Sequence, residues 1–283
     1  MKVLVTGFNG QLGYDVVKEL DKRNIASCGA DVNDFDITDA QQTTDFIKAY
    51  SPDVIVHCAA YTAVDRAEDD VDTCRRVNAE GTKNLCLAAL EADAKFIYIS
   101  TDYVYPGNGD KPYEVTDGTA PLSVYGKTKL EGEGYVQQLL EKYFIIRTSW
   151  VFGKNGNNFV KTMLKLGKEH ESLTVVCDQI GSPTYTPDLA VLICDMLMTE
   201  RYGIYHGTNE GFCSWAEFAS EIMAQAKLGA EIIPVTTAEY KASRATRPTN
   251  SRLSKNCLVE NGFKPLPHWT DALTRYLKEI DVI

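Results

Sequence analysis

Residues 1–13 read Met1-Lys-Val-Leu-Val-Thr-Gly-Phe-Asn-Gly-Gln-Leu-Gly13, an apolar stretch that continues directly into the pattern Gly7-x-x-Gly10-x-x-Gly13. The apolar run at 3–5 predicts a strand that is buried on both faces. The segment 11–23 predicts a helix, because its apolar residues fall on one stripe: Leu12, Val16, Val17 and Leu20. The three glycines therefore lie at a strand-to-helix turn.

Glycine at such a turn predicts a dinucleotide site. Gly7 allows the tight bend, Gly10 lets a pyrophosphate approach the backbone, and Gly13 lets the helix pack closely on the strand. The helix N-terminus offers unpaired N–H groups and partial positive charge to phosphates. Turns also collect glycine for steric reasons alone, but the strand before and the helix after favour the dinucleotide. The contacts expected here are Gly7, Asn9, Gly10, Gln11, Leu12 and Gly13.

Composition limits the partners of the chain. Its 29 basic and 39 acidic residues give a formal net charge of −10, which argues against non-specific binding to nucleic acid or to an anionic membrane. No apolar run approaches the roughly 20 residues of a membrane span, and no signal peptide precedes the first strand, so we expect a cytoplasmic protein. The eight cysteines show no C-x-x-C pattern and the four histidines no metal-ligand spacing, which predicts reduced thiols and no metal site.

The order of elements predicts the fold class. Strands expected at 25–31, 54–60, 95–101 and 143–151 alternate with helices, which is typical of an α/β fold with a Rossmann-type doubly wound parallel sheet. We expect residues 1–151 to form the NAD(P)-binding domain and residues 152–283 to form mainly a smaller C-terminal substrate-binding lobe. The segment 179–205 is expected to return to the first domain, because its helix at 187–199 is strongly apolar.

The second strand ends in Asp31, 18 positions after Gly13, near the distance at which a carboxylate binds the adenosine ribose hydroxyls. A solvated loop carboxylate is the alternative, since Asp31 belongs to a small acidic cluster. A carboxylate here would repel a 2′-phosphate, so NADH is slightly favoured, although Lys22 and Arg23 leave NADPH open. We expect further cofactor contacts in the same loop and after the next strand, at Asp36, Ile37, Ala59, Ala60 and Tyr61.

The reactive groups are expected where the strand 95–101 ends, in Thr101-Asp102-Tyr103, and on the following helix, in Tyr125-Gly-Lys-Thr-Lys129. Four residues span just over one helical turn, so the phenol of Tyr125 and the ammonium of Lys129 share a face. A nearby cation stabilises a phenolate, so we expect Tyr125 to exchange a proton near neutrality. Tyr125 would protonate a carbonyl oxygen whose carbon takes hydride from a nicotinamide, Lys129 would hold the cofactor ribose, and Thr101 would fix the carbonyl. Tyr14 and Lys18 share the spacing, and we interpret them as surface and packing residues.

Several longer motifs together resemble the dTDP-4-dehydrorhamnose reductases, a family of extended short-chain dehydrogenase/reductases. They are Thr6-Gly-x-x-Gly-x-x-Gly13, His57-Cys-Ala-Ala-Tyr-Thr-Ala-Val-Asp65, Ser100-Thr-Asp-Tyr-Val104, Tyr125-x-x-x-Lys129, Arg147-Thr-Ser-Trp-Val-Phe-Gly153, Asp178-Gln-x-Gly-x-Pro-Thr184 and Arg247-Pro-x-Asn-Ser251. The resemblance spans nearly the whole chain. It implies a C-terminal lobe that binds a sugar nucleotide and the reduction of dTDP-4-dehydro-L-rhamnose to dTDP-L-rhamnose with NADH or NADPH.

The resemblance also implies roles for single residues. Thr101, Asp102, Tyr125 and Lys129 would form the active centre, with Trp150 beside the sugar. Asn78, in the helical stretch 63–92, would orient water or backbone near the site, with a solvent-facing amide as the alternative. Tyr14-Asp15 stands where some relatives place a glutamate said to help a metal-bridged dimer, so both a monomer and a homodimer stay open.

Basic residues for a substrate diphosphate are expected in one run of the second half: Lys241, Arg244, Arg247 and Arg252. Guanidinium groups suit phosphate oxygens, but a solvated basic face is an equal alternative. Gln179 and Thr184 are weaker candidates for contacts near the sugar or nicotinamide. The substrate contacts expected overall are Thr101, Asp102, Tyr103, Trp150, Arg244 and Arg247.

Two rival functions stay open. A sugar-nucleotide 4,6-dehydratase or 4-epimerase can share the fold, but by resemblance a dehydratase carries Glu after Thr-Asp, where this chain has Tyr103. The regulatory subunit of methionine adenosyltransferase is also similar to these reductases and acts by binding a partner enzyme. The presence of Thr101, Tyr125 and Lys129 together argues against a purely regulatory role.

Overall fold

A six-stranded sheet forms the centre of the protein. The structure, a computed structural model, describes residues 1–240 and 244–283. The order of the strands is β10-β5-β4-β3-β1-β2, and every adjacent pair runs parallel. The strands are β1 (Lys2–Thr6), β2 (Ala26–Ala30), β3 (Val54–His57), β4 (Lys95–Thr101), β5 (Tyr143–Thr148) and β10 (Gly203–His206). The predicted doubly wound α/β class is confirmed.

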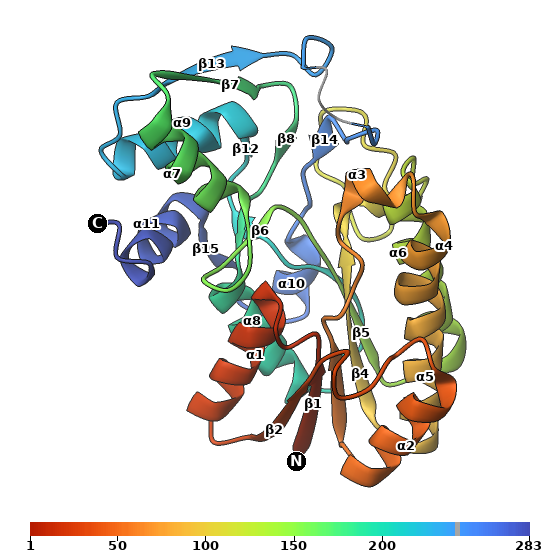
Figure 1. Ribbon diagram of the computed structural model, residues 1–283. Coiled ribbons are helices and arrows are strands. Elements are labelled where there is room, and N and C mark those ends of the chain that lie inside the picture. The colour runs from red at the N-terminus through yellow and green to blue at the C-terminus, as the bar shows by residue number, and fades with distance from the viewer. Residues whose placement is uncertain (241–243) are drawn as a thin grey trace.

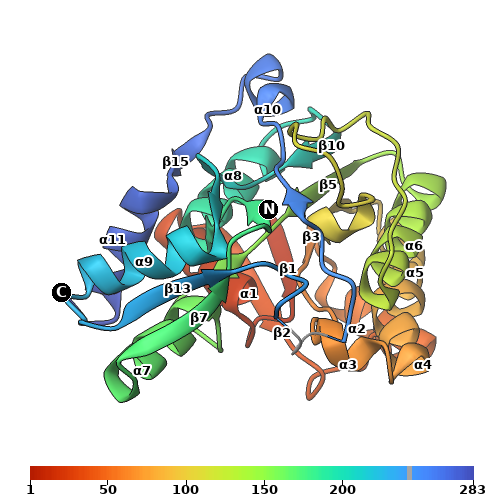
Figure 2. The ribbon, with the colours of Figure 1, turned by 90° about the horizontal axis from the view of Figure 1, so that it is seen from above.

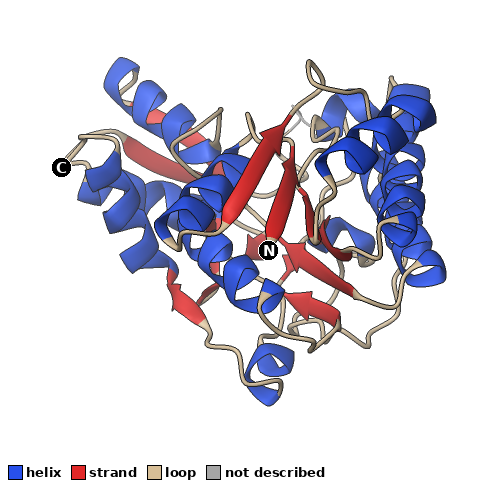
Figure 3. Cartoon of the chain, turned by 90° about the horizontal axis from the view of Figure 1, so that it is seen from below, coloured by secondary structure: helices blue, strands red, loops and turns tan. Residues whose placement is uncertain are grey.

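Helices cover both faces of this sheet (Figure 1). Along β1 the side chains alternate, so that Val3 and Val5 pack under α1 (Gln11–Lys22) and α8 (Thr186–Leu197), whereas Leu4 belongs to the core on the other face. The helices on that other face are α2 (Ala40–Tyr50), α5 (Thr82–Glu91) and α6 (Val124–Leu139). Figure 3 shows the same layering from below.

The stretch predicted to be helical between 63 and 92 is interrupted. It consists of α3 (Val64–Ala67), α4 (Val71–Arg75), the π-helical turn η1 (Arg76–Gly81) and then α5. Such turns often occur at functional sites. Asn78 lies in η1 and is buried, so the alternative of a solvent-facing amide is wrong.

The C-terminal lobe is built from short pairings around a second core, which includes Phe152, Phe218 and Tyr276. Its elements lie together on one side of the sheet (Figure 2). They are β6 (Val151–Phe152), α7 (Phe159–Glu169), β7 (Ser172–Val176), β8 (Ile180–Gly181), β9 (Thr184–Tyr185), β11 (Asn209–Glu210), β12 (Cys213–Ser214), α9 (Trp215–Gln225), β13 (Glu231–Val235), β14 (Asn250–Ser251), α10 (Asn256–Glu260), β15 (Leu266–His268) and α11 (Trp269–Glu279). Of the elements after β5, α8 and β10 belong to the central sheet and its cover, and α10 and Leu266 of β15 also pack into the core of that sheet.

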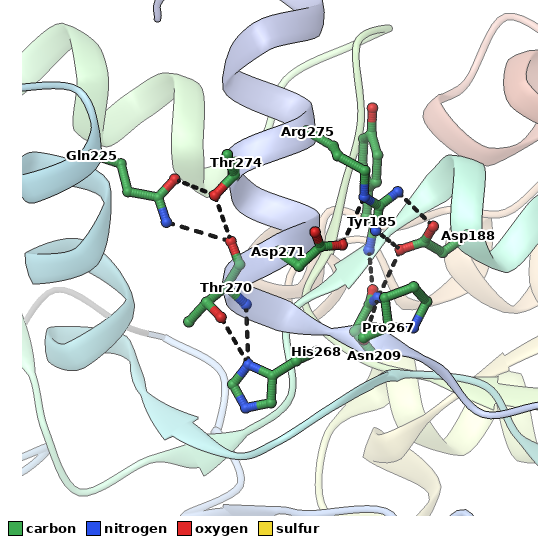
Figure 4. A network of polar contacts seen from close by, with 10 residues as sticks. All are labelled: Tyr185, Asp188, Asn209, Gln225, Pro267, His268, Thr270, Asp271, Thr274 and Arg275. Carbon is green, nitrogen blue, oxygen red and sulfur yellow. Dashed lines mark hydrogen bonds and ion pairs between the residues drawn. The ribbon is translucent and has the colours of Figure 1, made fainter.

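A polar network joins the C-terminal helix α11 to α8 (Figure 4). Both terminal nitrogens of Arg275 donate to the carboxylate of Asp188, at 2.7 Å each. Asn209 Nδ2 donates to Asp188 Oδ2 at 2.7 Å and to the Pro267 carbonyl at 2.9 Å. Because α8 itself covers the central sheet, this network fixes the C-terminal lobe against the sheet that carries the site.

The cysteines and the helix lengths are both the subject of predictions from composition. All eight cysteines are free thiols, as predicted. Within residues 1–240 and 244–283, no helix has the length and apolar character needed to cross a bilayer.

Candidate active site

A cleft of about 870 Å³ opens along the carboxyl ends of the central strands, where parallel α/β sheets bind their ligands. Most of the predicted residues line it: Gly7, Gly10, Gln11, Leu12, Gly13, Asp31, Asp36, Ile37, Ala59, Ala60, Thr101, Asp102, Tyr103, Tyr125, Lys129 and Trp150. Five others do not contribute to its wall: Asn9, Tyr61, Asn78, Arg244 and Arg247. Residues from β14 and α9, among them Ser251 and Trp215, complete the wall from the C-terminal lobe.

The glycine loop has the shape that a dinucleotide requires. Gly7 has a φ of 69°, and a Cβ at this position would lie 2.6 Å from the backbone nitrogen of Ala59. A Cβ at Gly13 would collide with the Gly7 carbonyl, so α1 packs on β1 only because residue 13 is glycine. The loop thus keeps its backbone open to the cleft at the N-terminus of α1, where phosphates bind.

The same loop is bonded to the C-terminal lobe. Gln11 Oε1 accepts hydrogen bonds from Gly153 N and Asn158 Nδ2, both at 3.0 Å. Asn155 Nδ2 donates to the Asn9 carbonyl at 2.6 Å. The carboxamide oxygen of Gln11 is therefore occupied by the protein itself, and the side chain helps to hold the two lobes in register.

Asp31 ends β2 beside the glycine loop. Its Oδ2 lies 3.3 Å from Asn9 N, and its Oδ1 accepts from Val32 N at 2.8 Å. The basic residues that left NADPH open lie in other contacts, since Lys22 pairs with Glu19 and Arg23 pairs with Glu19 and with an aspartate of α8. Asp31 thus lies against the glycine loop, in the wall of the cleft.

Thr101 and Tyr125 lie together in the wall of the cleft. Thr101 Oγ1 donates to Asp102 Oδ1 at 3.0 Å and accepts from Tyr103 N at 3.2 Å. Burial raises the pKa of Tyr125 well above its usual range, and the hydrogen bond with Thr101 acts in the opposite direction. The expected stabilisation of the phenolate by Lys129 is opposed by this burial, because desolvation disfavours the charged form.

Lys129 lies deep behind Tyr125, with only 2% of its surface exposed. Its Nζ lies 4.0 Å from the centroid of the Tyr98 ring, a cation–π contact. Burial lowers the pKa of Lys129 to about 7, and the carboxylate of Glu133, one turn further along α6, acts in the opposite direction. A small change in the surrounding charge thus decides how much of Lys129 is an ammonium group at neutral pH.

Asn78 orients backbone next to the site. Its Oδ1 accepts from Tyr61 N at 2.8 Å, and its Nδ2 donates to the Tyr61 carbonyl at 3.1 Å and to Thr128 Oγ1 at 3.2 Å. These bonds fix the segment after β3, which carries the cleft residues Ala59 and Ala60, against helix α6.

Trp150 forms an aromatic wall with a residue that the sequence did not indicate. Its ring stacks on Trp215, with centroids 3.6 Å apart and planes at 13°. Trp150 has a φ of 51°, a conformation that is costly for a bulky side chain. The strand expected to extend to residue 151 therefore ends earlier, at Thr148. A Cβ at Gly181 would come within 2.8 Å of the Trp150 ring, so the absence of a side chain at Gly181 makes room for this wall.

The basic run is divided among different contacts. Arg244 pairs with Asp69 at the surface. Arg247 Nη2 lies 2.6 Å from Asp65 Oδ2, and its Nη1 lies 3.4 Å from the Tyr103 hydroxyl. Arg252 bonds to Asn250, and Lys241 lies outside the described residues. Among the members of the run that the structure describes, Arg247 is therefore the one whose side chain reaches a residue of the cleft wall.

Comparison with known proteins agrees with this site. Residues 1–282 match the family described as RmlD substrate binding domain. A dTDP-4-dehydrorhamnose reductase of Aggregatibacter actinomycetemcomitans is 42% identical over 286 residues, which cover 96% of this chain and 97% of that protein. The chain belongs to the dTDP-4-dehydrorhamnose reductase family. Spore coat polysaccharide biosynthesis protein SpsK of Bacillus subtilis is 41% identical over 98% of this chain and 97% of its own.

Solved structures extend the likeness to three dimensions. The dTDP-4-dehydrorhamnose reductase of Bacillus anthracis, in complex with NADP, has a TM-score of 0.96 and 44% identity, covering 98% of this chain and 99% of that one. At 20% identity and a TM-score of 0.86, a UDP-glucose 4-epimerase of Thermus thermophilus shares the fold. Membership of the dTDP-4-dehydrorhamnose reductase family makes this chain an oxidoreductase, and its open glycine loop and buried lysine fit a nicotinamide dinucleotide.

Proposed function

We propose that the chain reduces the 4-keto group of dTDP-4-dehydro-L-rhamnose to give dTDP-L-rhamnose, with Tyr125 as the proton donor and NADH or NADPH as the reductant. The observation that carries the proposal is that Thr101, Tyr125 and the buried Lys129 line one cleft, which the glycine loop and the C-terminal lobe share. Family membership supplies the substrate class.

The residues divide the chemistry as follows. When it is bound, the dihydronicotinamide supplies a hydride. Thr101 and Tyr125 hold the ketone oxygen, and because the pKa of Tyr125 is raised, the phenol keeps its proton until the developing alkoxide takes it. Lys129, in its ammonium form, holds the cofactor ribose and stabilises the phenolate that remains after the transfer.

The wall of Trp150 and Trp215 provides a flat apolar surface for a sugar ring at the mouth of the cleft. Arg247 is the guanidinium best placed to meet a diphosphate, because it already reaches Tyr103. Arg244 stays a prediction for the same group, at greater distance from the chemistry. These assignments make the C-terminal lobe the source of substrate recognition and the sheet the source of catalysis.

A direct assay tests the function. Purified protein is mixed with dTDP-4-dehydro-L-rhamnose and either NADH or NADPH, and the loss of reduced-nicotinamide absorbance is followed while the sugar product is identified. We expect rapid oxidation in the wild type and a rate at least roughly a hundredfold lower in Tyr125→Phe, which binds cofactor equally well. Wild-type turnover in that variant would remove Tyr125 from the mechanism.

The same assay separates the rival functions. A 4-epimerase returns the hydride it takes and therefore retains NAD through purification, whereas a reductase exchanges cofactor in every turnover. A regulatory subunit would bind cofactor without oxidising it in the presence of any sugar nucleotide. Tight cofactor binding without oxidation would move the assignment to one of these two.

We further propose that NADH is preferred, because Asp31 places a negative charge where a 2′-phosphate would lie. The NADP complex of the Bacillus anthracis relative is the reason to test this directly. Asp31→Ala should shift the ratio of kcat/KM for NADPH over NADH upward by about tenfold, the scale of one lost charge repulsion. An unchanged ratio would show that Asp31 does not select the cofactor.

A further inference from the structure

A chain of hydrogen bonds connects the C-terminal lobe to Thr101, next to Tyr125 in the cleft wall. Ser251 Oγ lies 2.5 Å from Asp102 Oδ2, and the other oxygen of Asp102 accepts from Thr101 at 3.0 Å. Tyr125 lines the same cleft as Thr101. Ser251, Asp102 and Thr101 are only 3–4% exposed, and all three lie in the wall of the cleft. Ser251 is thus the only one of these groups to come from outside the first half of the sequence.

Ser251 is held firmly at both sides. Its strand β14 pairs with β8, where Ser251 lies opposite Gly181, beneath the Trp150 ring. On the other side, Thr249 N and Asn250 N donate to the Gly107 carbonyl at 2.9 and 3.0 Å. The serine hydroxyl is therefore fixed relative to the aromatic wall of Trp150 and Trp215 as well as to the loop that follows β4.

The direction of the hydrogen bonds decides what Thr101 can do. Its hydroxyl has one proton, and Asp102 Oδ1 accepts that proton when the carboxyl is ionised. Thr101 can donate to a substrate carbonyl only when the Asp102 carboxyl is a weaker acceptor for that proton or is itself protonated. A donor at Oδ2 changes both the ionisation and the orientation of the carboxyl, and Ser251 is that donor.

We propose that Ser251 is a positioning residue for ketone reduction: by holding Asp102, it sets the orientation of the Thr101 hydroxyl and so couples the C-terminal lobe to proton transfer. The proposal rests on the proposed function, since it requires a carbonyl oxygen between Thr101 and Tyr125.

The pKa of Asp102 is the quantity through which this role of Ser251 can be measured. Burial raises the pKa of Asp102 to about 6, and the bonds from Ser251 and Thr101 act in the opposite direction. Tyr103 on the same turn and Tyr125 on α6 also face the carboxyl, and Tyr103 in turn contacts Arg247, which pairs with Asp65. Loss of the serine donor should therefore raise the pKa of Asp102 by about one unit or more. A hydrogen bond to a charged group changes an ionisation constant by about tenfold or more.

The test is the pH profile of kcat/KM between pH 5 and 9 for the full chain with its cofactor and sugar nucleotide. We expect a wild-type transition near pH 6 that is absent in Asp102→Asn, that moves up by about one pH unit or more in Ser251→Ala, and that moves less far in Ser251→Cys, which keeps a weak donor. Thr249→Val is the matched control, because it removes a hydroxyl bond of the same segment to the Gly107 carbonyl and leaves Asp102 untouched.

The outcomes are distinct. A shift in Ser251→Ala with an unchanged Thr249→Val profile and unchanged cofactor affinity supports the positioning role. The role is overturned if the Ser251→Ala profile superimposes on that of the wild type, if Thr249→Val moves it equally, or if the wild type has no transition near pH 6. Absence of wild-type turnover defeats the proposed function and the positioning role together, whereas turnover with an unmoved Ser251→Ala profile defeats only the latter. Should Ser251→Ala fail to fold, a smaller upward shift in Ser251→Cys supports the role, and a Ser251→Cys profile that superimposes on that of the wild type overturns it.

Discussion

Replacing Glu133 by glutamine should destabilise the fold and shift the pH range of activity at the same time. Glu133 is completely buried, and its carboxylate forms a double hydrogen bond with Arg147, at 2.9 and 2.7 Å. Ser100 Oγ donates to the same carboxylate at 2.5 Å. Glutamine keeps the volume but leaves the guanidinium as an uncompensated buried charge, which costs about 3–5 kcal/mol of the free energy of unfolding.

The effect on activity comes through Lys129, which lies one helical turn before Glu133. Burial alone lowers the pKa of Lys129, and the Glu133 carboxylate raises it, with a net value of about 7. Without that carboxylate the pKa falls further, so the ammonium form disappears at a lower pH. Because catalysis requires the ammonium, the decline of kcat/KM with rising pH should begin at a lower pH in Glu133→Gln than in the wild type.

Urea unfolding followed by tryptophan fluorescence measures the first effect and the pH profile measures the second. Glu131→Gln is the matched control on the same helix, because Glu131 pairs with Arg75 at the surface, where such pairs contribute about 0–1 kcal/mol. Removing both buried charges, in Glu133→Leu/Arg147→Met, should recover much of the loss. If Glu133→Gln loses no more stability than Glu131→Gln, or if its alkaline decline stays in place, the reasoning about this buried pair is refuted.

Three further predictions follow from single contacts. Gly181→Ala should lower kcat/KM for the sugar nucleotide by about tenfold with cofactor affinity unchanged, because the added Cβ meets the Trp150 ring; steady-state kinetics and a cofactor titration test this. Arg275→Met should lower the free energy of unfolding, measured in urea, by about 1–2 kcal/mol, because it removes the two hydrogen bonds to Asp188 that fix α11. Burial lowers the pKa of His57 to about 3, so as the pH falls below about 6.5 the imidazole is protonated in the unfolded chain but not in the folded protein. The free energy of unfolding should then fall by up to roughly 1.4 kcal/mol per pH unit, and by less in His57→Gln. Unfolding measured between pH 7.5 and 5.5 tests this.

The parts of the site that the sequence predicts are those whose residues are close together along the chain. The glycine loop lies between one strand and one helix, and Tyr125 and Lys129 share one helical turn. Local periodicity is enough to place such groups on a common edge or face. Their occurrence in the lining of one cleft therefore follows from two local patterns and the parallel order of the strands.

The residues that the sequence does not indicate reach the site through long-range packing. Trp215 looks like the first residue of a helix, and only the positive φ of Trp150 and the bare backbone of Gly181 bring the two indole rings together. Ser251 belongs to a recognisable motif, but nothing in that motif shows that its hydroxyl meets Asp102. No periodicity links positions so far apart, since the contacts depend on how the C-terminal lobe folds back over the sheet.

The burial of Tyr125 shows why charge spacing along a helix is a poor guide to the pKa of a buried group. The spacing correctly placed Lys129 one turn from Tyr125, yet burial acts on both and disfavours the charged form of each. The phenol therefore holds its proton more firmly and the ammonium holds its proton less firmly than in water. An acid of this kind does not release its proton to water, but it can release it to the alkoxide that hydride addition creates, which is a much stronger base than water. The burial that defeats the simple electrostatic argument thus ties the proton transfer to the arrival of the hydride.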